Sequence, residues 1–511
     1  MTTTAPPAPP AQSSSVASKG LKLGAIGLLS SIVIGVSSTA PGYSLAATLG
    51  GVSSEVGTKA PIIMLLAFVP MLFISYAYKA LNAAEADCGT SFTWVAKAFG
   101  AHAGWLTGWA IVVADVIVMA ALAQIAGVYG FLLFGLDDLA ANANAVTAAG
   151  CVWILIMTWI SYRGIELSAR IQYILLGAEL LILGVFAVVA LYKVYSGSGD
   201  ELSIKPALDW FNPSGLTFTA LSAGFLLAVF IYWGWDTAVT ANEETSNPAV
   251  NPGRAAVRST IILLVTYVLV TVAAQAFAGV GTDGIGLANP DHSDDVLSSV
   301  GEAVLGSWGV KLLILAVLSS AAASTQTTIL PTARTTLSMA AFKAIPKSFA
   351  KVSPKYQTPT VSTWAMGLVS IAFYAGLTYF NESALSDLIL AIGLLIAFYY
   401  GITGFASAWY FRREIFRSAG AFFLKGLFPF LGGVILFAAM VRTAIDSYDP
   451  EFGYTTYFNV GGVFVLGVGS MALGVVLMII WNIVAPKYFG GSTLREQAAA
   501  PVATGAHAAV D

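Results

Sequence analysis

Two short stretches decide how this chain folds: Gly35-Val36-Ser37-Ser38-Thr39-Ala40-Pro41-Gly42 and Tyr232-Trp233-Gly234-Trp235-Asp236. Each interrupts an apolar run long enough to cross a lipid bilayer, and each contains residues that favour a break in a helix. Backbone groups without helical partners are tolerated at membrane depth only where they line a cavity or are buried in protein. Two interruptions at matching places of an internal repeat therefore predict a shared binding site, and hence a transporter.

The composition is that of a membrane protein. Of the 511 residues, 57% are hydrophobic and 10% are charged, and the mean hydropathy is +0.79. Soluble domains carry roughly 25% charged residues, so a soluble globular protein is excluded. A helix needs about 20 mainly apolar residues to cross the hydrocarbon core. The sequence therefore predicts an all-α polytopic membrane protein with twelve transmembrane helices, at about 23–49, 58–81, 103–134, 144–162, 168–194, 216–241, 256–280, 308–342, 359–380, 385–411, 422–445 and 459–484.

The basic residues predict the orientation. If the N-terminus is cytoplasmic, 19 of the 24 Lys and Arg residues fall on the cytoplasmic side, which matches the positive-inside bias. We therefore expect a multi-pass protein of the plasma (inner) membrane with both termini in the cytoplasm. A disordered tail is expected at 1–18 and a second cytoplasmic tail at 491–511, on either side of a transporter domain at 19–490.

Three motifs resemble those of a known family. The stretch from Phe230 to Pro248, FIYWGWDTAVTANEETSNP, resembles the signature of the amino acid-polyamine-organocation permeases. The segment from Arg334 to Pro359, with Ile345-Pro346-Lys347, is similar to an inner loop of that family, and so is Gly89 to Trp109. The resemblance implies the LeuT-like fold, with broken helices 1 and 6. It implies five-plus-five inverted repeats at about 23–194 and 216–411, extra helices at 422–484, and secondary transport of amino acids or related amines.

The broken helices predict a substrate site. A break leaves N–H groups bare at the start of one half-helix and C=O groups bare at the end of the other, which suits the two charges of an α-amino acid. The N–H groups around Ser37, Ser38 and Thr39 are expected to hold the carboxylate. The ammonium is expected at carbonyls near Val33, Ile34, Phe230 and Ile231, with Gly35, Trp233 and Gly234 in the same two segments. The alternative for the first stretch is close helix packing through small residues. The resemblance implies that Phe230 is the gate over bound substrate.

Three acidic residues lie at membrane depth, where an ionisable group is a functional candidate. The resemblance places Glu179 where many proton-coupled relatives carry a lysine. Because a carboxyl group shielded from water is protonated more readily, Glu179 could carry a proton; the alternative is a buried acid that bonds a neighbouring helix. Asp236 is a second coupling candidate, with helix capping as its alternative. Asp115 is a third, for which a structural or cavity-lining role is favoured.

Sodium is the rival coupling ion. The hydroxyl groups of Ser320 and Ser324 could join carbonyl oxygens of the first break as ligands for sodium, although such side chains more often bond their own helix. No histidine lies in a predicted span and no nucleotide-binding loop is present, so an enzyme is not expected. We expect no cofactor, resident metal or nucleic acid, and as partners only substrate, coupling ion and membrane lipid.

These observations predict an amino acid permease working by alternating access, with proton symport as the expected mode. An antiporter of polyamines or amino acids and a sodium symporter remain alternatives. A sensor that binds an amino acid without moving it would use the same site.

Overall fold

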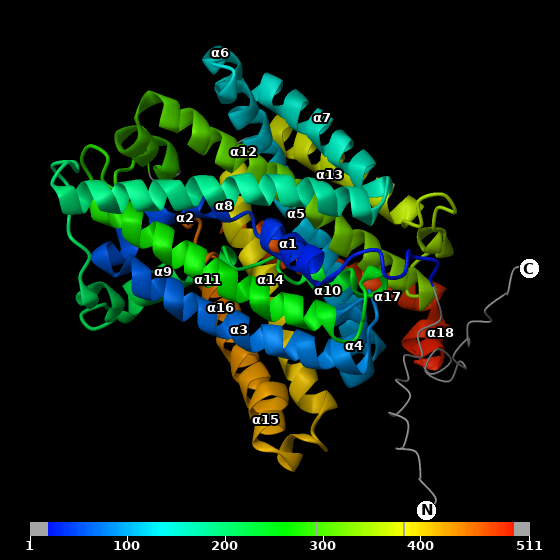
Figure 1. The fold of residues 1–511 in the computed structure, drawn as a ribbon. Coiled ribbons are helices and arrows are strands. Elements are labelled where there is room, and N and C mark those ends of the chain that lie inside the picture. The colour runs from blue at the N-terminus through cyan, green and yellow to red at the C-terminus, as the bar shows by residue number, and fades with distance from the viewer. Residues whose placement is uncertain (1–18, 293–294, 382–383, 495–511) are drawn as a thin grey trace, which may run out of the picture.

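The computed structural model describes residues 19–292, 295–381 and 384–494, and long helices dominate it (Figure 1). The predicted tail at 1–18 and most of the one at 491–511 lie outside the described residues. The α-helices are α1 (Leu28–Ser38), α2 (Pro41–Val56), α3 (Ala60–Ala84), α4 (Ser91–Phe99), α5 (Ala101–Leu133), α6 (Asp137–Ala140), α7 (Ala143–Tyr162), α8 (Ile165–Ser196), α9 (Phe218–Phe230), α10 (Thr237–Thr240), α11 (Asn251–Ala278), α12 (Val296–Ala341), α13 (Thr360–Phe380), α14 (Ala384–Tyr410), α15 (Ala419–Ala421), α16 (Phe428–Asp446), α17 (Gly462–Val484) and α18 (Pro486–Phe489).

The remaining elements are short. They are the 3-10 turns η1 (Gly57–Lys59), η2 (Leu208–Phe211), η3 (Asn242–Glu244), η4 (Lys347–Ala350) and η5 (Ile415–Arg417), the π-helical turn η6 (Phe422–Leu427), and the antiparallel strands β1 (Thr456–Tyr457) and β2 (Val460–Gly461). The short helix α4 lies between α3 and α5, and its side chains Phe92 and Trp94 are buried.

The chain is an all-α polytopic membrane protein. Within the described residues, ten segments are long and apolar enough to cross a membrane. One of these, Leu28–Ala84, contains α1, α2 and α3, and so covers two of the predicted spans. The predicted span at 216–241 corresponds to α9 and α10, and α9 alone has 13 residues. The difference between ten segments and twelve predicted spans therefore arises because Leu28–Ala84 covers two predicted spans and α9 is too short to count as one.

The half-helices lie inside the bundle. Helix α1 packs against α8, α10, α11 and α12, and the long helix α12 also packs against α5 and α8. All residues of α10 are buried, as are Ser31 and the residues from Val33 to Ser38 in α1. These helices thus bring the two interrupted segments together, away from the surface that faces lipid.

Both ends of the described chain lie at the same end of the bundle, on the right in Figure 1. Leu21, from the segment before α1, packs beside Cys88 and Leu337, while Tyr488 and Phe489 of α18 pack beside Phe92. The segment before α1 also pairs with η3, because the N–H of Ile26 donates to the carbonyl of Glu244 at 3.1 Å. We call this the terminal end.

Candidate functional site: two interrupted helices

The first interruption is two residues long. Helix α1 ends at Ser38 and α2 begins at Pro41. Between them, Ala40 has a φ of +47°, a left-handed conformation that ends the first helix. Pro41 then suits the first position of the next helix, because its missing N–H would have no helical partner there. The local sequence thus accounts for the break.

The second interruption runs from Ile231 to Asp236, between α9 and α10. It contacts the first directly: a Cβ atom on Gly234 would lie 2.7 Å from the carbonyl oxygen of Ser38. Gly234 also has a φ of +112°, which favours glycine. The hydroxyl groups of Ser38 and Thr237 are 2.8 Å apart. Glycine therefore allows the two breaks to approach backbone to backbone.

Polar side chains from two other helices hold the start of α2. The N–H of Gly42 donates to Oε1 of Glu179 at 2.6 Å, and the N–H of Tyr43 donates to the hydroxyl of Ser320 at 3.2 Å. Glu179 is fully buried in α8, and within the described chain its Oε2 has no hydrogen-bond partner. A buried carboxyl group thus lies at the positive end of a helix.

A small polar cavity lies between the breaks. Its volume is about 10 Å³, which is room for one water molecule at most. Asp236 accepts hydrogen bonds from Tyr400 at 2.8 Å and from Tyr399 at 3.4 Å. Asp115 accepts a hydrogen bond from Thr332 at 2.5 Å. The lining residues are Ser38, Asp115, Trp233, Gly234, Asp236, Thr237, Thr328, Pro331 and Tyr399.

The chain also matches a known protein family. The model of the amino acid permeases matches residues 26–489, a range that contains both interruptions. The chain belongs to the amino acid permease family. The family resemblance predicted from the sequence is confirmed, and the permease is a transporter, not an enzyme.

Curated relatives of the permease are transporters by name. It is 26% identical to the vacuolar cationic amino acid transporter 4 of Arabidopsis thaliana over 74% of its own length and 61% of that protein's. It is 25% identical to the branched-chain amino acid permease BcaP of Bacillus subtilis, over 67% and 72% of the two chains. It is 27% identical to the methylthioribose transporter of the same species, over 66% and 70%. These relatives are named for different substrates.

The structure brings some of the predicted site residues to the cavity and leaves others away from it. Ser38, Trp233, Gly234, Asp115 and Asp236 line it, and Ser324 reaches its edge by donating to the carbonyl of Ser38 at 2.9 Å. The capping interpretation of Asp236 is wrong, because its side chain makes no capping bond to α10 and turns to the tyrosines of α14 instead.

Other predicted residues do not line the cavity. Val33, Ile34, Gly35 and Ser37 are buried within α1. The N–H of Thr39 bonds within its own turn, to the carbonyl of Val36 at 3.1 Å, so the N–H groups at the start of α2 are those of Gly42 and Tyr43.

On the second segment, the carbonyl of Ile231 accepts a hydrogen bond from Tyr267 at 2.5 Å. Phe230 lines a separate space of about 20 Å³ between α9, α14 and α16.

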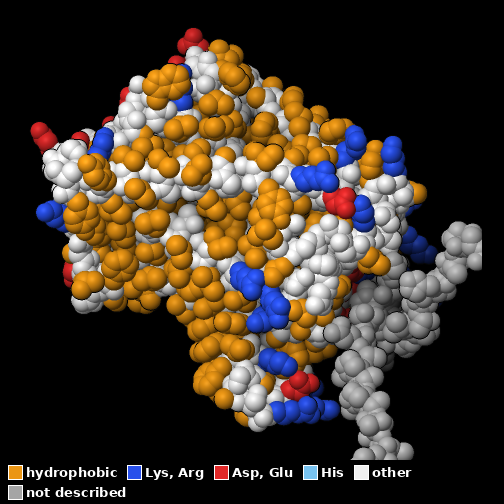
Figure 2. Space-filling model, in the orientation of Figure 1, with side chains coloured by type: hydrophobic (Ala, Val, Ile, Leu, Met, Phe, Trp, Pro, Cys, Tyr) orange, Lys and Arg blue, Asp and Glu red, His pale blue; other side chains and the backbone are white. Residues whose placement is uncertain are grey.

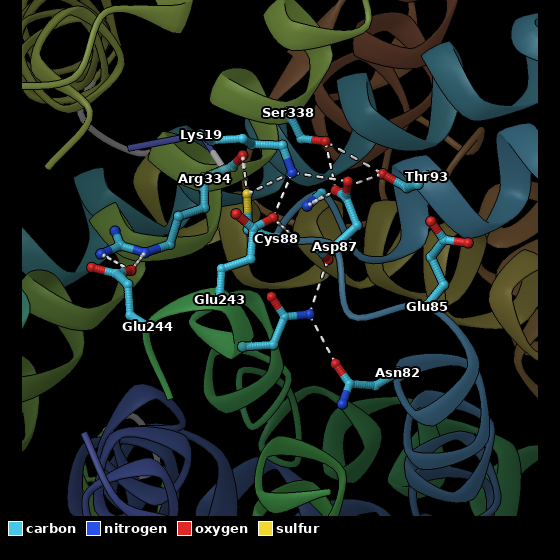
Figure 3. A network of polar contacts seen from close by, with 12 residues as sticks. Lys19, Asn82, Glu85, Asp87, Cys88, Thr93, Glu243, Glu244, Arg334 and Ser338 are labelled. Carbon is cyan, nitrogen blue, oxygen red and sulfur yellow. Dashed lines mark hydrogen bonds and ion pairs between the residues drawn. The ribbon is translucent and has the colours of Figure 1, made fainter. Parts of the chain in front are cut away.

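Sequence reasoning missed Tyr399 and Tyr400, which hold Asp236. The available signal was a pair of adjacent tyrosines inside the predicted span 385–411, since a buried phenol needs a hydrogen-bond partner. It also missed the polar network at the terminal end, shown in Figure 3.

The centre of that network is Lys19. Its ammonium lies 2.8 Å from Asp87, 2.5 Å from Glu243 and 3.6 Å from the sulfur of Cys88. Burial opposes the charge on Lys19, but the nearby carboxylates outweigh it and raise the lysine pKa well above its ordinary value. The three partner groups could in principle ligate a metal ion. Here the chain itself supplies the positive charge.

A second buried ion pair lies beside Lys19. Arg334 of α12 binds Glu244 of η3, with 2.6 Å between nitrogen and oxygen, and Ser338 donates to Asp87 at 2.6 Å. Because a buried pair is costly to break once formed, these contacts hold the N-terminal segment, η3 and α12 together.

Proposed function

We propose that the permease is a secondary active transporter that binds an amino acid between its two interrupted helices and works by alternating access. The observation that carries this proposal is the contact between Gly234 and the carbonyl of Ser38. Two interrupted helix ends beside buried carboxyl groups form the kind of midplane site that broken helices provide. A cavity of about 10 Å³ cannot hold an amino acid, so binding must move the half-helices apart.

We assign substrate contacts to both interruptions. The carboxylate would bind near the start of α2 and the ammonium near the carbonyls at the end of α1 and α9. The hydroxyl of Ser37 supports this placement, because it is buried and has no partner within the described chain. The proposed substrate-binding residues are Val33, Ile34, Gly35, Ser37, Ser38, Thr39, Phe230, Ile231, Trp233 and Gly234, with Phe230 as the gate.

Glu179 is the proposed proton carrier. Its Oε1 holds the N–H of Gly42, while its Oε2 has no partner among the described residues. A proton can therefore arrive on Oε2 without breaking the bond to α2. Sodium is the alternative, with Ser320 and Ser324 as ligands, because both hydroxyls contact backbone groups at the first break.

Asp115 and Asp236 favour a substrate with a second positive charge. Both carboxyl groups line the central cavity, Asp115 from α5 and Asp236 from the second interruption. A basic amino acid or a diamine would pair with them, whereas a branched-chain side chain would leave them without a cation. This favours the substrate named for the Arabidopsis relative over the one named for BcaP.

The proposed setting is the plasma membrane, with the terminal end in the cytoplasm, as the positive-inside bias requires. Counting each interrupted pair as one crossing, the proposed architecture has twelve spans, with two inverted repeats and two appended helices. The remaining alternatives are an antiporter and a non-transporting sensor.

Uptake into proteoliposomes tests the proposal. Radiolabelled lysine and leucine would be offered with an imposed proton gradient, with a sodium gradient, and with unlabelled substrate inside. Accumulation driven by protons, with lysine preferred, is the expected result. Accumulation driven only by sodium would identify sodium, instead of the proton, as the coupling ion. Exchange without accumulation would identify an antiporter, and binding without uptake would identify a sensor.

A further inference from the structure

A basic pocket lies at the terminal end, apart from the central cavity. Its volume is about 240 Å³. Four of its side chains are cationic and one is anionic, so the lining has a formal charge of about +3. The lining residues are Lys22, Arg163, Gly164, Ile165, Glu166, Leu167, Arg170, Lys355, Tyr356 and Gln357. Figure 2 shows basic side chains gathered around one acidic side chain near the start of α8.

The pocket is assembled from three segments that are far apart in the sequence: the one before α1, the one from Arg163 to Arg170, and the one before α13. Lys22 comes from the segment before α1, Arg163 follows α7, Arg170 belongs to α8, and Lys355 precedes α13. The hydroxyl of Thr358 donates to the carbonyl of Tyr162 at 2.8 Å, which ties the loop before α13 to the end of α7. The positive charges thus converge because the fold brings them together.

Aromatic rings hold two of the cations in position. The Arg163 guanidinium lies 4.9 Å from the ring centre of Trp159 and 5.2 Å from that of Tyr356. The Lys355 ammonium lies 5.3 Å from the same Tyr356 ring. Cation–π contacts restrict both side chains without neutralising them. A ligand would therefore find charges that are already oriented.

The pocket also contains the start of a 32-residue helix. Helix α8 begins at Ile165 after Gly164, and no side chain caps its first turn in the described chain. The first residues of α8 line the pocket. Bare N–H groups and the positive end of the helix dipole favour an anion there. The helix start and the four cations point to the same kind of ligand.

We propose that this pocket binds a phosphate group. Guanidinium groups bind phosphate oxygens through paired hydrogen bonds, and basic pockets between membrane helices accept anionic lipid headgroups. The source of the phosphate is an anionic phospholipid or a soluble phosphate compound. The single acid, Glu166, pairs with Lys22 at 2.8 Å, with both side chains nearly half exposed. A bound phosphate would replace Glu166 as the ion-pair partner of Lys22 and hold the segment before α1 against α8.

Thermal unfolding of the full-length protein tests this site. One arm compares nanodiscs of phosphatidylcholine with nanodiscs that also contain phosphatidylglycerol. The other adds inorganic phosphate to phosphatidylcholine nanodiscs, with chloride at the same ionic strength as the reference. A ligand that binds the folded protein raises its unfolding temperature. Stabilisation by the lipid alone identifies a headgroup site, and stabilisation by inorganic phosphate identifies a site for soluble anions.

The double variant Arg163→Gln/Arg170→Gln should lower the affinity for the stabilising ligand, lipid or phosphate, at least about tenfold. Its matched control is Arg412→Gln/Arg413→Gln, because Arg412 also lies over a tryptophan, 4.5 Å from the ring of Trp409. The control should keep the full effect. Equal losses in both double variants, or no stabilisation of the parent in either arm, would overturn the proposal.

A variant that makes the pocket more positive controls for the possibility that the double variant loses binding because it misfolds. Glu166→Gln removes the only acid of the pocket and should strengthen phosphate binding severalfold, since a like charge near the ligand is lost. A damaged protein could not produce tighter binding. Unchanged or weaker binding in Glu166→Gln would contradict the assignment.

Discussion

Oε1 of Glu179 lies 2.6 Å from the backbone nitrogen of Gly42, so a carboxyl group of α8 holds the first turn of α2. This bond joins the predicted proton carrier to the helix whose movement would open the site. A change in the charge of Glu179 alters its attraction to the positive end of α2. In the proposed mechanism, this one contact couples protonation of Glu179 to movement of the half-helix.

Glu179→Gln should abolish accumulation driven by a pH gradient while leaving exchange of internal for external substrate. The amide oxygen can still accept the N–H of Gly42, but the side chain no longer carries a proton. Proteoliposome uptake measures both activities. Glu201→Gln, at an exposed position, is the control and should behave as the parent. Unchanged uphill uptake in Glu179→Gln would remove this residue from the coupling mechanism.

Gly234→Ala should destabilise the protein by about 1–3 kcal/mol and reduce transport strongly. The new methyl group would lie 2.7 Å from the carbonyl oxygen of Ser38, on a backbone with positive φ. Unfolding temperature and uptake provide the measurements. At Gly184 in α8 a Cβ atom meets nothing within 4 Å, so Gly184→Ala should be neutral or stabilising. Wild-type transport by Gly234→Ala would show that the close approach of the two breaks is dispensable.

Lys19→Gln should cost about 3–5 kcal/mol, because it leaves two buried carboxylates without their cation. The Lys19 and Asp87 side chains are 5% and 1% exposed. By contrast, the Lys425 and Glu414 pair is 35% and 46% exposed, and Lys425→Gln should cost about 0–1 kcal/mol. Unfolding of both variants in the same detergent gives the comparison. Similar small losses for the two lysines would mean that water reaches the network.

The contribution of Asp87 to the free energy of unfolding should fall only at acidic pH. Burial opposes its charge, but Lys19 outweighs burial and holds the pKa of Asp87 below its usual value. Because the pKa of Asp87 is lower in the folded state, its ionised form stabilises the protein at pH values above the unfolded pKa of about 3.9. This stabilisation is lost as the pH falls through the folded pKa. The stability difference between parent and Asp87→Asn should therefore be constant from about pH 5 to 8. A difference that shrinks between about pH 7 and 5 would contradict the lowered pKa.

Cys88 should react slowly with maleimide in the folded protein. Burial, together with Glu243, raises the pKa of its thiol well above the ordinary value, so little thiolate forms even in mildly alkaline solution. A Cys151→Ser background leaves Cys88 as the single thiol. Labelling at about pH 8 to 9 should be slow in the parent and faster after Lys19→Gln opens the network. Labelling of the folded parent as fast as in detergent-denatured protein would show that the terminal end is open.

The sequence by itself determined the features that depend on neighbouring residues. Apolar runs predicted the membrane class, and Pro41 and Gly234 marked the two interruptions, because proline lacks an N–H and glycine accepts positive φ. The motifs around both stretches identified the family.

The tertiary structure alone decided which distant side chains meet. Nothing near Asp236 in the sequence indicates that its carboxyl group accepts a hydrogen bond from Tyr400, 164 residues away, instead of capping α10. Lys19 likewise meets Glu243 across 224 residues, and three separate segments supply the basic pocket. Local sequence determines where a helix begins, ends or breaks, but its rotation and depth depend on packing with every neighbour at once.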